Sequence, residues 1–343
     1  MSADGTTRRA TPLSQRLLPV AVALLAAYPA LLILRGAARA PAGFLKNALE
    51  GVSLGGVYAL IALGYTMVYG VLGLINFAHS DVFMVGAYVG VFAGAALGVT
   101  SSYAGPSSPG ATLASIAAAM AACALLGMVI ERLAYRPIRK APKLTPLVTA
   151  IGVSMLLQNV SMLAFTATPR GFPPLLRATN VGVGGVEVTS VKLIDLGAAL
   201  ALMVALTFLV RRTRVGRAMR AISTNLEAAR LMGVPTDRII AITFGLGSTL
   251  AGAGGILFGL DQPRVDPFIG VQPGLKAFVA AVLGGIGNIP GAMLGGLLIG
   301  VVEQLAAAYL SSSFAPAIVF SILVVVLLVR PQGLLGRVTR EKV

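Results

Sequence analysis

The sequence predicts an all-α protein, a polytopic bundle of transmembrane helices. Of its 343 residues, 57% are hydrophobic and 11% are charged, and the mean hydropathy is +0.88. These values lie far outside the range of soluble domains. The apolar residues also come in windows of about 20, the length that a helix needs to cross a hydrocarbon core. The thickness of a bilayer core fixes the length of a spanning helix, and windows of that length predict about 8–10 membrane segments.

Ten apolar windows follow one another, separated by short polar or Gly/Pro-containing breaks. They lie near residues 17–34, 45–69, 82–98, 111–133, 147–167, 193–210, 239–260, 276–288, 291–309 and 316–329. The window 276–288 is too short to cross comfortably, which predicts a half-helix or re-entrant segment. Such backbone is tolerated where protein or a water-filled cavity satisfies its polar groups. One or two interrupted helices are therefore expected in the bundle.

The N-terminal region divides into a tail at 1–16, expected in the cytoplasm, and an added helix and loop at 17–44. A cleaved signal peptide is the alternative, because an A-x-A pattern at 38–40 follows an Arg-bearing start and an apolar run. That run is longer than the usual apolar region of a signal peptide, and Pro41 follows the candidate cleavage site. We therefore prefer the interpretation that this apolar run is retained as a helix in the mature protein.

The net charge of +15 is concentrated in two connections between apolar windows. The first holds five basic residues, Arg132, Arg136, Arg139, Lys140 and Lys143, and the second begins with Arg211, Arg212, Arg214, Arg217 and Arg220. An even number of crossings separates the two connections, so the positive-inside rule places both in the cytoplasm. The segment 168–192 then faces outward.

Catalytic motifs are missing from the sequence. It contains no G-x-x-x-x-G-K-[ST] loop and no dinucleotide fingerprint, so the chain is not expected to hydrolyse ATP or bind a cofactor itself. A single histidine, His79, and a single cysteine, Cys123, cannot supply a typical metal site. No activated Ser or Cys motif accompanies His79, which argues against an intramembrane enzyme.

Polar residues gather in the stretch YGVLGLINFAHSDVFMVG, where Asn76, His79, Ser80 and Asp81 stand between two apolar windows. Ionisable groups in a membrane bundle normally face its interior, a cavity or an aqueous boundary. The stretch is expected to interrupt the helix. VLGGIGN, ending at Asn288, resembles VLGLIN, ending at Asn76, and paired interruptions can mark a transport pathway. Three roles stay open for Asn76, His79, Asp81 and Asn288: helix capping, a pathway, or a gating or subunit contact.

Gly86, Gly90, Gly94 and Gly98 fall four residues apart and line one helix face. This pattern of overlapping G-x-x-x-G steps lets two backbones approach closely. It fits dense packing within one chain and a subunit interface equally well.

The stretch RVGRAMRAISTNLEAARLMGVPTDR, within 211–238, is too long for a simple turn and too polar for a span. Asn225 can cap a short helix, Glu227 lies in its positive first turn, and Gly233 then Pro235 close it. We expect a short helix along the cytoplasmic face. Such a helix needs something to rest against, and a soluble partner is the economical candidate.

This loop carries a resemblance to a known family. Glu227, Ala228, Ala229 and Gly233 match the E-A-A-x-x-x-G loop by which ABC importer permeases dock on their ATPase subunits. The other matching segments are ALIALGYTMVYGVLGLINFAH at 59–79, VGRAMRA at 215–221, GVPTDR at 233–238 and KAFVAAVLGGIGNIPGAMLGG at 276–296. From about residue 45 to the C-terminus the chain resembles branched-chain amino acid ABC importer permeases, and within them the LivH-type subunit of the LivH/LivM permease family.

The resemblance implies a non-catalytic permease domain at 45–343, with its coupling loop at 211–238, in the bacterial plasma membrane. It implies import of branched-chain or related hydrophobic amino acids, with a LivM-like second permease, two cytoplasmic ABC ATPases that bind the ATP, and an extracytoplasmic substrate-binding protein. The expected docking residues are Arg217, Arg220, Glu227, Ala228, Ala229, Gly233, Asp237 and Arg238. Two departures are Ser80, where the family usually has Gly, and the added first segment.

Two alternatives remain. One is a permease for urea or short amides, since related importers share these motifs. The other is an ion-coupled secondary transporter using Asp81, Glu131 or Glu303. Glu50, Glu131 and Glu303 lie near segment ends, where an interfacial placement is expected, and this weakens the second alternative. A secondary transporter also has no use for an ATPase-docking loop.

Overall fold

The computed structural model describes residues 30–100, 109–139, 141–142, 144–330 and 332–336. Residues 30–39 form a helix, and the rest of the predicted N-terminal tail and first apolar window lies outside the described residues. Each of the other predicted windows coincides with a helix. These helices are α2 (Pro41–Leu72), α3 (His79–Ala96), α4 (Pro109–Ile130), α5 (Leu144–Phe165), α6 (Ser190–Arg212), α9 (Thr236–Asp261), α10 (Val271–Gly284), α11 (Ile289–Tyr309) and α12 (Ala315–Val329).

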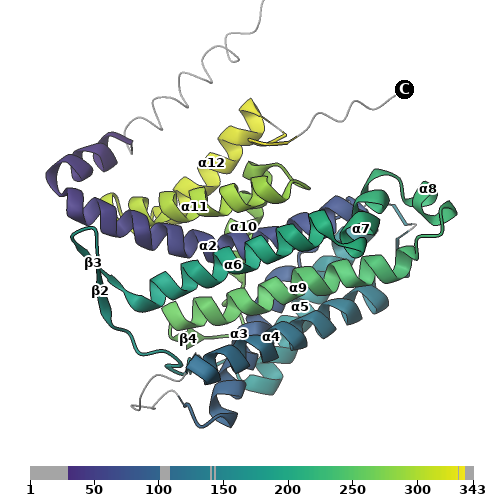
Figure 1. Ribbon diagram of the computed structural model, residues 1–343, viewed down its shortest axis with the longest axis horizontal. Coiled ribbons are helices and arrows are strands. Elements are labelled where there is room, and N and C mark those ends of the chain that lie inside the picture. Colours follow the sequence, from purple (N-terminus) through teal and green to yellow (C-terminus); the bar gives the residue numbers. More distant parts are fainter. Residues whose placement is uncertain (1–29, 101–108, 140, 143, 331, 337–343) are drawn as a thin grey trace, which may run out of the picture.

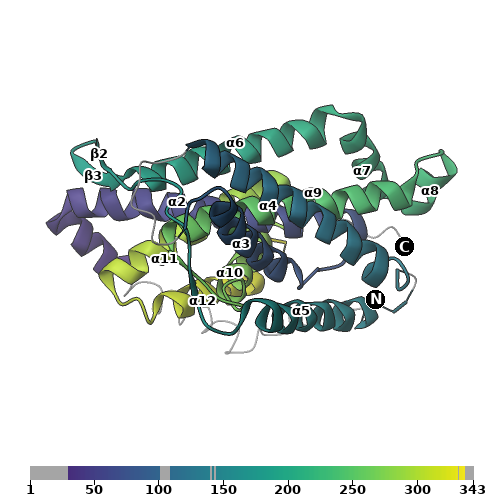
Figure 2. The same cartoon turned by 90° about the horizontal axis from the view of Figure 1, so that it is seen from below.

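The bundle is the predicted polytopic one. Within the described residues, six helices are long and apolar enough to cross a membrane: α2, α4 with its continuation to Tyr135, α5, α6, α9 and α11. The shorter apolar helices are α10 and α12. The long helices lie side by side along the molecule, with α7 (Arg214–Thr224) and α8 (Leu226–Leu231) at one end (Figure 1). Helices α2 and α9 are largely buried, whereas α5 lies at the edge of the bundle (Figure 2).

Glycines allow close helix contacts in the core. A β carbon at Gly55 of α2 would lie 2.7 Å from the Cα of Leu297 on α11, and one at Gly86 of α3 would lie 2.6 Å from the Cα of Gly252 on α9. These are backbone contacts, so larger residues would force the helices apart.

The predicted glycine stripe is used mainly inside this chain. Gly86 packs on α9, Gly90 meets Ile256 and Phe172, and Gly94 meets Pro173. Gly98 has a different role, because it takes a φ of 79° just after α3. There the Gly98 N–H bonds to the Ala95 carbonyl and the Val99 N–H to the Gly94 carbonyl, the Schellman arrangement that ends a helix. Internal packing therefore accounts for the first three positions and helix termination for the fourth.

The part of the chain that the structure describes also contains four short strands that the sequence did not predict. Strand β1 (Arg170–Gly171) pairs antiparallel with β4 (Arg264–Val265), and β2 (Asn180–Val183) pairs antiparallel with β3 (Val186–Thr189). Gly184 and Gly185, between β2 and β3, have φ values of 58° and 85°. Two successive positive φ values suit the twist of a tight hairpin. The all-α bundle thus carries a small strand-containing connection at 168–192.

The two ends of α9 test the predicted topology. At its N-terminal end, Asp237 forms ion pairs with Arg136 and Arg139, so the connections 135–143 and 211–238 lie at the same end of the bundle. At its C-terminal end, the β1–β4 pairing holds 168–192 at the opposite end. This is the arrangement predicted from the basic residues.

Candidate functional site

The chain breaks between α2 and α3 at the predicted interruption. Helix α2 ends at Leu72, Gly73 takes a φ of 67°, and α3 begins only at His79. Ser80 lies within α3 and has no positive φ. The replacement of the family's glycine by Ser80 is therefore accommodated, because the left-handed turn occurs at Gly73.

Helix α3 begins deep inside the bundle. The ring of His79 lies against Gly64 of α2, and Gly64 packs on Gly247, where a β carbon would be 3.3 Å from the Gly64 Cα. Gly247 is near the middle of the 26-residue helix α9. The ring of Tyr65 meets His79 edge-on at 5.0 Å between centroids. The His79 side chain is 1% exposed, so it lies at mid-depth and out of reach of bulk water.

Helix α10 begins at the same level. Its first residues, together with Gly270, pack against Ser80, and the ring of Phe278 lies 5.9 Å from that of Phe77 and 6.2 Å from that of Tyr65. With 14 residues, α10 is the expected half-helix. The N-terminal ends of α3 and α10 therefore meet in the interior. Helix N-termini present free N–H groups and a partial positive charge, a feature of discontinuous helices at transport sites.

The polar side chains at the start of α3 face different neighbours. Asn76 Oδ1 accepts hydrogen bonds from the Ala78 N–H at 3.1 Å and from the Tyr135 hydroxyl at 3.0 Å. Asp81 Oδ1 accepts from Gln158 Nε2 of α5 at 2.9 Å. His79 Nε2 and Asp81 Oδ2 have no hydrogen-bond partner within the described part of the chain. Asn76 thus stabilises the turn just before α3, whereas His79 and Asp81 each keep one buried polar atom free.

Asn288 lies elsewhere. It caps α11 by accepting from the Gly291 N–H at 3.2 Å, and its amide donates to the Leu335 carbonyl at 2.6 Å, at one end of the bundle. The two similar interruptions do approach each other, because a β carbon at Gly70 would lie 3.6 Å from the Cα of Gly287. The structure brings Asn76, His79 and Asp81 together and leaves Asn288 apart from them.

The predicted surface helix is present as α8. Asn225 Oδ1 accepts from the Ala228 N–H at 2.9 Å, and Glu227 lies in the first turn. Gly233, with a φ of 80°, ends the helix in a Schellman arrangement, in which the Gly233 N–H bonds to the Arg230 carbonyl and the Val234 N–H to the Ala229 carbonyl. The last apolar side chain of the helix, Leu231, is 89% exposed.

The remaining residues predicted for this loop divide into anchored and free groups. Ala229 is buried against the loop, and Arg220 donates to the Val210 carbonyl at the end of α6. Asp237 is paired with Arg136 and Arg139. The exposed residues are Arg217, Glu227, Ala228 and Arg238.

Sequence reasoning missed a cluster beside α8. Arg136 Nη2 lies 2.6 Å from Asp237 Oδ2, and Arg139 Nη1 lies 2.7 Å from Asp237 Oδ1. Arg139 also pairs with Glu131, whose side chain is 2% exposed. The basic residues of 132–143 were assigned only to membrane orientation. Their spacing in the sequence gave no sign of the pairing with Asp237, about a hundred residues later.

Two of the three carboxylates considered for ion coupling, Glu131 and Glu303, are paired within the protein, whereas Asp81 keeps its Oδ2 atom free. Glu303 accepts from Lys276 Nζ at 2.6 Å and from the Tyr58 hydroxyl at 3.0 Å, while Glu50 accepts from Gln304 at 3.0 Å. The expected interfacial placement of Glu131 and Glu303 stays a prediction, and the side chains of both residues are largely buried against cationic partners. An internal cationic partner satisfies the charge of each, which argues against ion coupling at these two residues.

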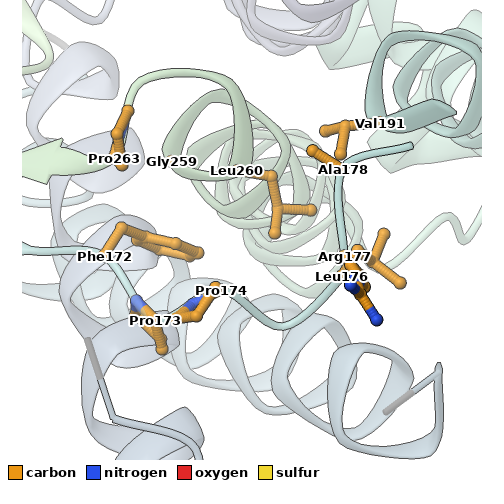
Figure 3. A pocket seen from close by; sticks show the side chains of 10 residues that line it. All are labelled: Phe172, Pro173, Pro174, Leu176, Arg177, Ala178, Val191, Gly259, Leu260 and Pro263. Carbon is orange, nitrogen blue, oxygen red and sulfur yellow. The ribbon is translucent and has the colours of Figure 1, made fainter. Parts of the chain in front are cut away.

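A pocket of about 360 Å³ opens at the end of the bundle that carries the strands (Figure 3). Apolar side chains dominate its wall, and Arg177 is the charged one. The lining residues are Phe172, Pro173, Pro174, Leu176, Arg177, Ala178, Val191, Gly259, Leu260 and Pro263. Residues from three separate segments meet here, next to the β1–β4 pair.

These features define a class of protein. Apolar spans, two helices that begin inside the bundle, and a capped surface helix at one end are the parts of a multi-pass membrane permease. A family model described as the permease component of a branched-chain amino acid transport system matches residues 47–329. The chain belongs to this family, as a non-catalytic permease subunit of a bacterial multi-subunit ABC transport system.

Curated relatives agree over most of the chain. The high-affinity branched-chain amino acid transport system permease protein LivH of Salmonella typhimurium is 44% identical over 308 residues, covering 88% of this chain and 98% of the relative. LivH of Escherichia coli is 43% identical with the same coverage. The corresponding permease BraD of Pseudomonas aeruginosa is 41% identical over 304 residues, also covering 88% and 98%.

Proposed function

We propose that this chain is the LivH-type subunit of an importer that moves branched-chain or related hydrophobic amino acids into the cytoplasm. The observation that carries the proposal is α8, a short helix held rigidly by Asn225 and Gly233 while its outward side chains stay exposed. A rigid helix with exposed apolar side chains at the end of a membrane bundle suits docking to a soluble subunit. The substrate class rests on the names of relatives that are more than 40% identical.

We propose four partner subunits around this chain. Two cytoplasmic ABC ATPases bind the ATP, and one of them receives α8 beside a groove of about 580 Å³ formed by α8 and the segment Arg136–Arg139. A LivM-like permease pairs with this chain through the membrane. An extracytoplasmic binding protein delivers the amino acid at the opposite end, where the pocket near Arg177 and the β2–β3 hairpin lie.

We also propose that the junction of α3 and α10 works as a gate or part of the pathway. His79 Nε2 and Asp81 Oδ2 support this role, because a buried polar atom without a partner costs free energy unless a solute, water or second conformation satisfies it. Asn76, which holds the turn before α3, and Asn288, which caps α11, serve this role indirectly by fixing where the two helices begin.

Reconstitution tests the function and separates its alternatives. The chain is placed in proteoliposomes with the permease, ATPases and binding protein encoded beside it, and uptake of radiolabelled leucine is followed. We expect uptake that needs internal ATP and the binding protein. Uptake driven by an ion gradient without ATP would support a secondary transporter. Transport of urea or acetamide but not leucine would instead assign the chain to the permeases for urea or short amides.

A further inference from the structure

A continuous line of contacts runs from α8 to the start of α3. Its first step is covalent, since only residues 232–235 separate α8 from α9. The Val234 N–H bonds to the Ala229 carbonyl at 3.1 Å, so this linker is folded onto α8. Asp237 follows in the first turn of α9. A displacement of α8 therefore acts directly on Asp237.

The second step passes from the surface into the protein. Asp237 binds Arg136 and Arg139 with one carboxylate oxygen each, and Arg139 also binds Glu131. The exposed fraction of the side chains falls along this line, from 44% at Asp237 to 14% at Arg139 and 2% at Glu131. Charge-assisted hydrogen bonds of arginine are directional and strong when partly buried. They link α9 firmly to the end of α4.

The third step is a π-helical turn. Glu131 and Tyr135 are its first and last residues, and the Arg136 N–H bonds to the Glu131 carbonyl at 2.8 Å. Such turns are rare in proteins. Where they occur, they often lie at functional sites, because they widen a helix locally and can change its winding. The turn places the Tyr135 side chain, which is 0% exposed, next to Phe244 with 5.1 Å between ring centroids.

The last step reaches α3. The Tyr135 hydroxyl donates to Asn76 Oδ1 at 3.0 Å, and the same oxygen accepts from the Ala78 N–H just before His79. Asn76 is 2% exposed, so water does not compete for this bond. Tyr135 is thus the residue through which the π-turn holds the turn that leads into α3.

We propose that Tyr135 is a positioning residue for transport: its hydrogen bond to Asn76 couples α8, through Asp237, Arg139 and Glu131, to the interior start of α3. The proposal deepens the proposed function, since it rests on α8 being the ATPase contact. Closure of the ATPases would move α8, and the Tyr135–Asn76 bond would transmit that movement to the segment that carries His79. Without this hydrogen bond, closure of the ATPases and movement of the start of α3 would proceed separately.

The test uses Tyr135→Phe in the complete reconstituted transporter, with uptake and ATP hydrolysis measured together. Phenylalanine keeps the buried ring, and Asn76 keeps its bond to the Ala78 N–H, so the variant is expected to fold. Because a buried hydrogen bond contributes modestly to an equilibrium, we expect substrate moved per ATP to fall about two- to tenfold while ATP hydrolysis persists. Asp237→Asn should reduce the same ratio.

Tyr88→Phe is the matched control. Tyr88 is 1% exposed and its hydroxyl has no hydrogen-bond partner among the described residues, so losing the hydroxyl should leave the ratio unchanged. A double-mutant cycle combines Tyr135→Phe with Asp237→Asn, and non-additive losses are expected if the two act in one line. A wild-type ratio in Tyr135→Phe, or strictly additive losses, would overturn the proposal. Failure of the wild-type complex to hydrolyse ATP would instead contradict the proposed function.

Discussion

Two helix starts with similar sequences have opposite surroundings in this protein. Asn76, at the end of VLGLIN, is buried and bound by Tyr135, whereas Asn288, at the end of VLGGIGN, binds the Leu335 carbonyl near the C-terminal end. Asn288 caps α11 by accepting from the Gly291 N–H, and Asn76 accepts from the Ala78 N–H in the turn just before α3. The local sequence therefore places an asparagine that holds a backbone N–H ahead of both helices.

The two asparagines differ in the part of the protein to which each helix start is attached. The start of α3 is attached through polar contacts to the end of the bundle that carries α8, and its neighbour His79 has a free polar atom. The start of α11 is also attached by close backbone packing, with Gly291 against Gly284 of α10. Directional bonds can be exchanged during a transport cycle, whereas close-packed backbones resist displacement. We infer that the start of α3, before its later turns pack on α9 through Gly86, belongs to the moving part and that α11 belongs to the fixed frame.

The largest expected effect follows from packing at α11. A β carbon at Gly296 would lie 2.5 Å from the Cα of Ala59, so Gly296→Leu should force α2 and α11 apart. Overpacking of this kind destabilises by about 1–3 kcal/mol and occasionally more. Thermal unfolding in detergent should show a large fall in Tm or no folded protein. Gly197→Leu on α6, where the β carbon meets nothing within 4 Å, should unfold like the wild type.

Substitutions of the two asparagines compare the start of α3 with the start of α11. Asn288→Ala should lose about 1 kcal/mol of stability, the usual value of a cap, and keep transport. Asn76→Ala should lose the bond to the Ala78 N–H and also leave the Tyr135 hydroxyl buried without its acceptor, about 1–3 kcal/mol more. Tm and uptake measured side by side give the comparison. Equal losses of uptake in the two variants would remove the distinction between a moving α3 and a fixed α11.

Substitutions of His79 test whether its free Nε2 atom at the start of α3 takes part in transport. If a neutral imidazole acts as a gate or pathway group, His79→Asn should lose less uptake than His79→Leu, which removes every hydrogen-bonding group. Uptake by the wild type should vary little between about pH 5.5 and 8, since ATP and not a histidine proton drives the cycle. Full uptake in His79→Leu would leave the residue with a packing role against Tyr65.

Orientation can be fixed with single cysteine substitutions at exposed positions. Thr179 and Thr224 are both exposed and lie at opposite ends of the bundle. In intact cells, an impermeant thiol reagent should label Thr179→Cys and spare Thr224→Cys, because the basic connections face the cytoplasm. The native Cys123 is buried and should not react. The reverse labelling pattern would invert the bundle and move α8 away from any cytoplasmic ATPase.

Local signals in the sequence predicted much of this structure. Apolar windows of membrane-spanning length located the helices, Asn225 and Gly233 located α8, and basic residues placed two connections at the same end. The β2–β3 hairpin was missed, although Gly184-Gly185 between valine-rich runs is a hairpin signal. That signal is easily lost in a glycine-rich chain.

Long-range contacts were beyond sequence reasoning. The pairing of Arg139 with Asp237 and the bond from Tyr135 to Asn76 join residues whose proximity depends on how separate segments pack. Hydropathy and charge counts carry no information on such pairs. The same limit applies to Glu303, whose partner Lys276 comes from a different helix.

The most direct test of the central claim, that α8 couples this permease to ATPases, compares two glycines. Gly233 and Gly98 end helices in the same arrangement, with φ values of 80° and 79° and nothing within 4 Å of a β carbon, but at opposite ends of the bundle. Gly233→Trp and Gly98→Trp impose the same backbone strain. Co-purification of the ATPases and uptake of leucine are then measured with membrane insertion as the control. We predict that Gly233→Trp inserts but loses ATPase binding and uptake, whereas Gly98→Trp retains both; survival of both activities in Gly233→Trp would contradict the account.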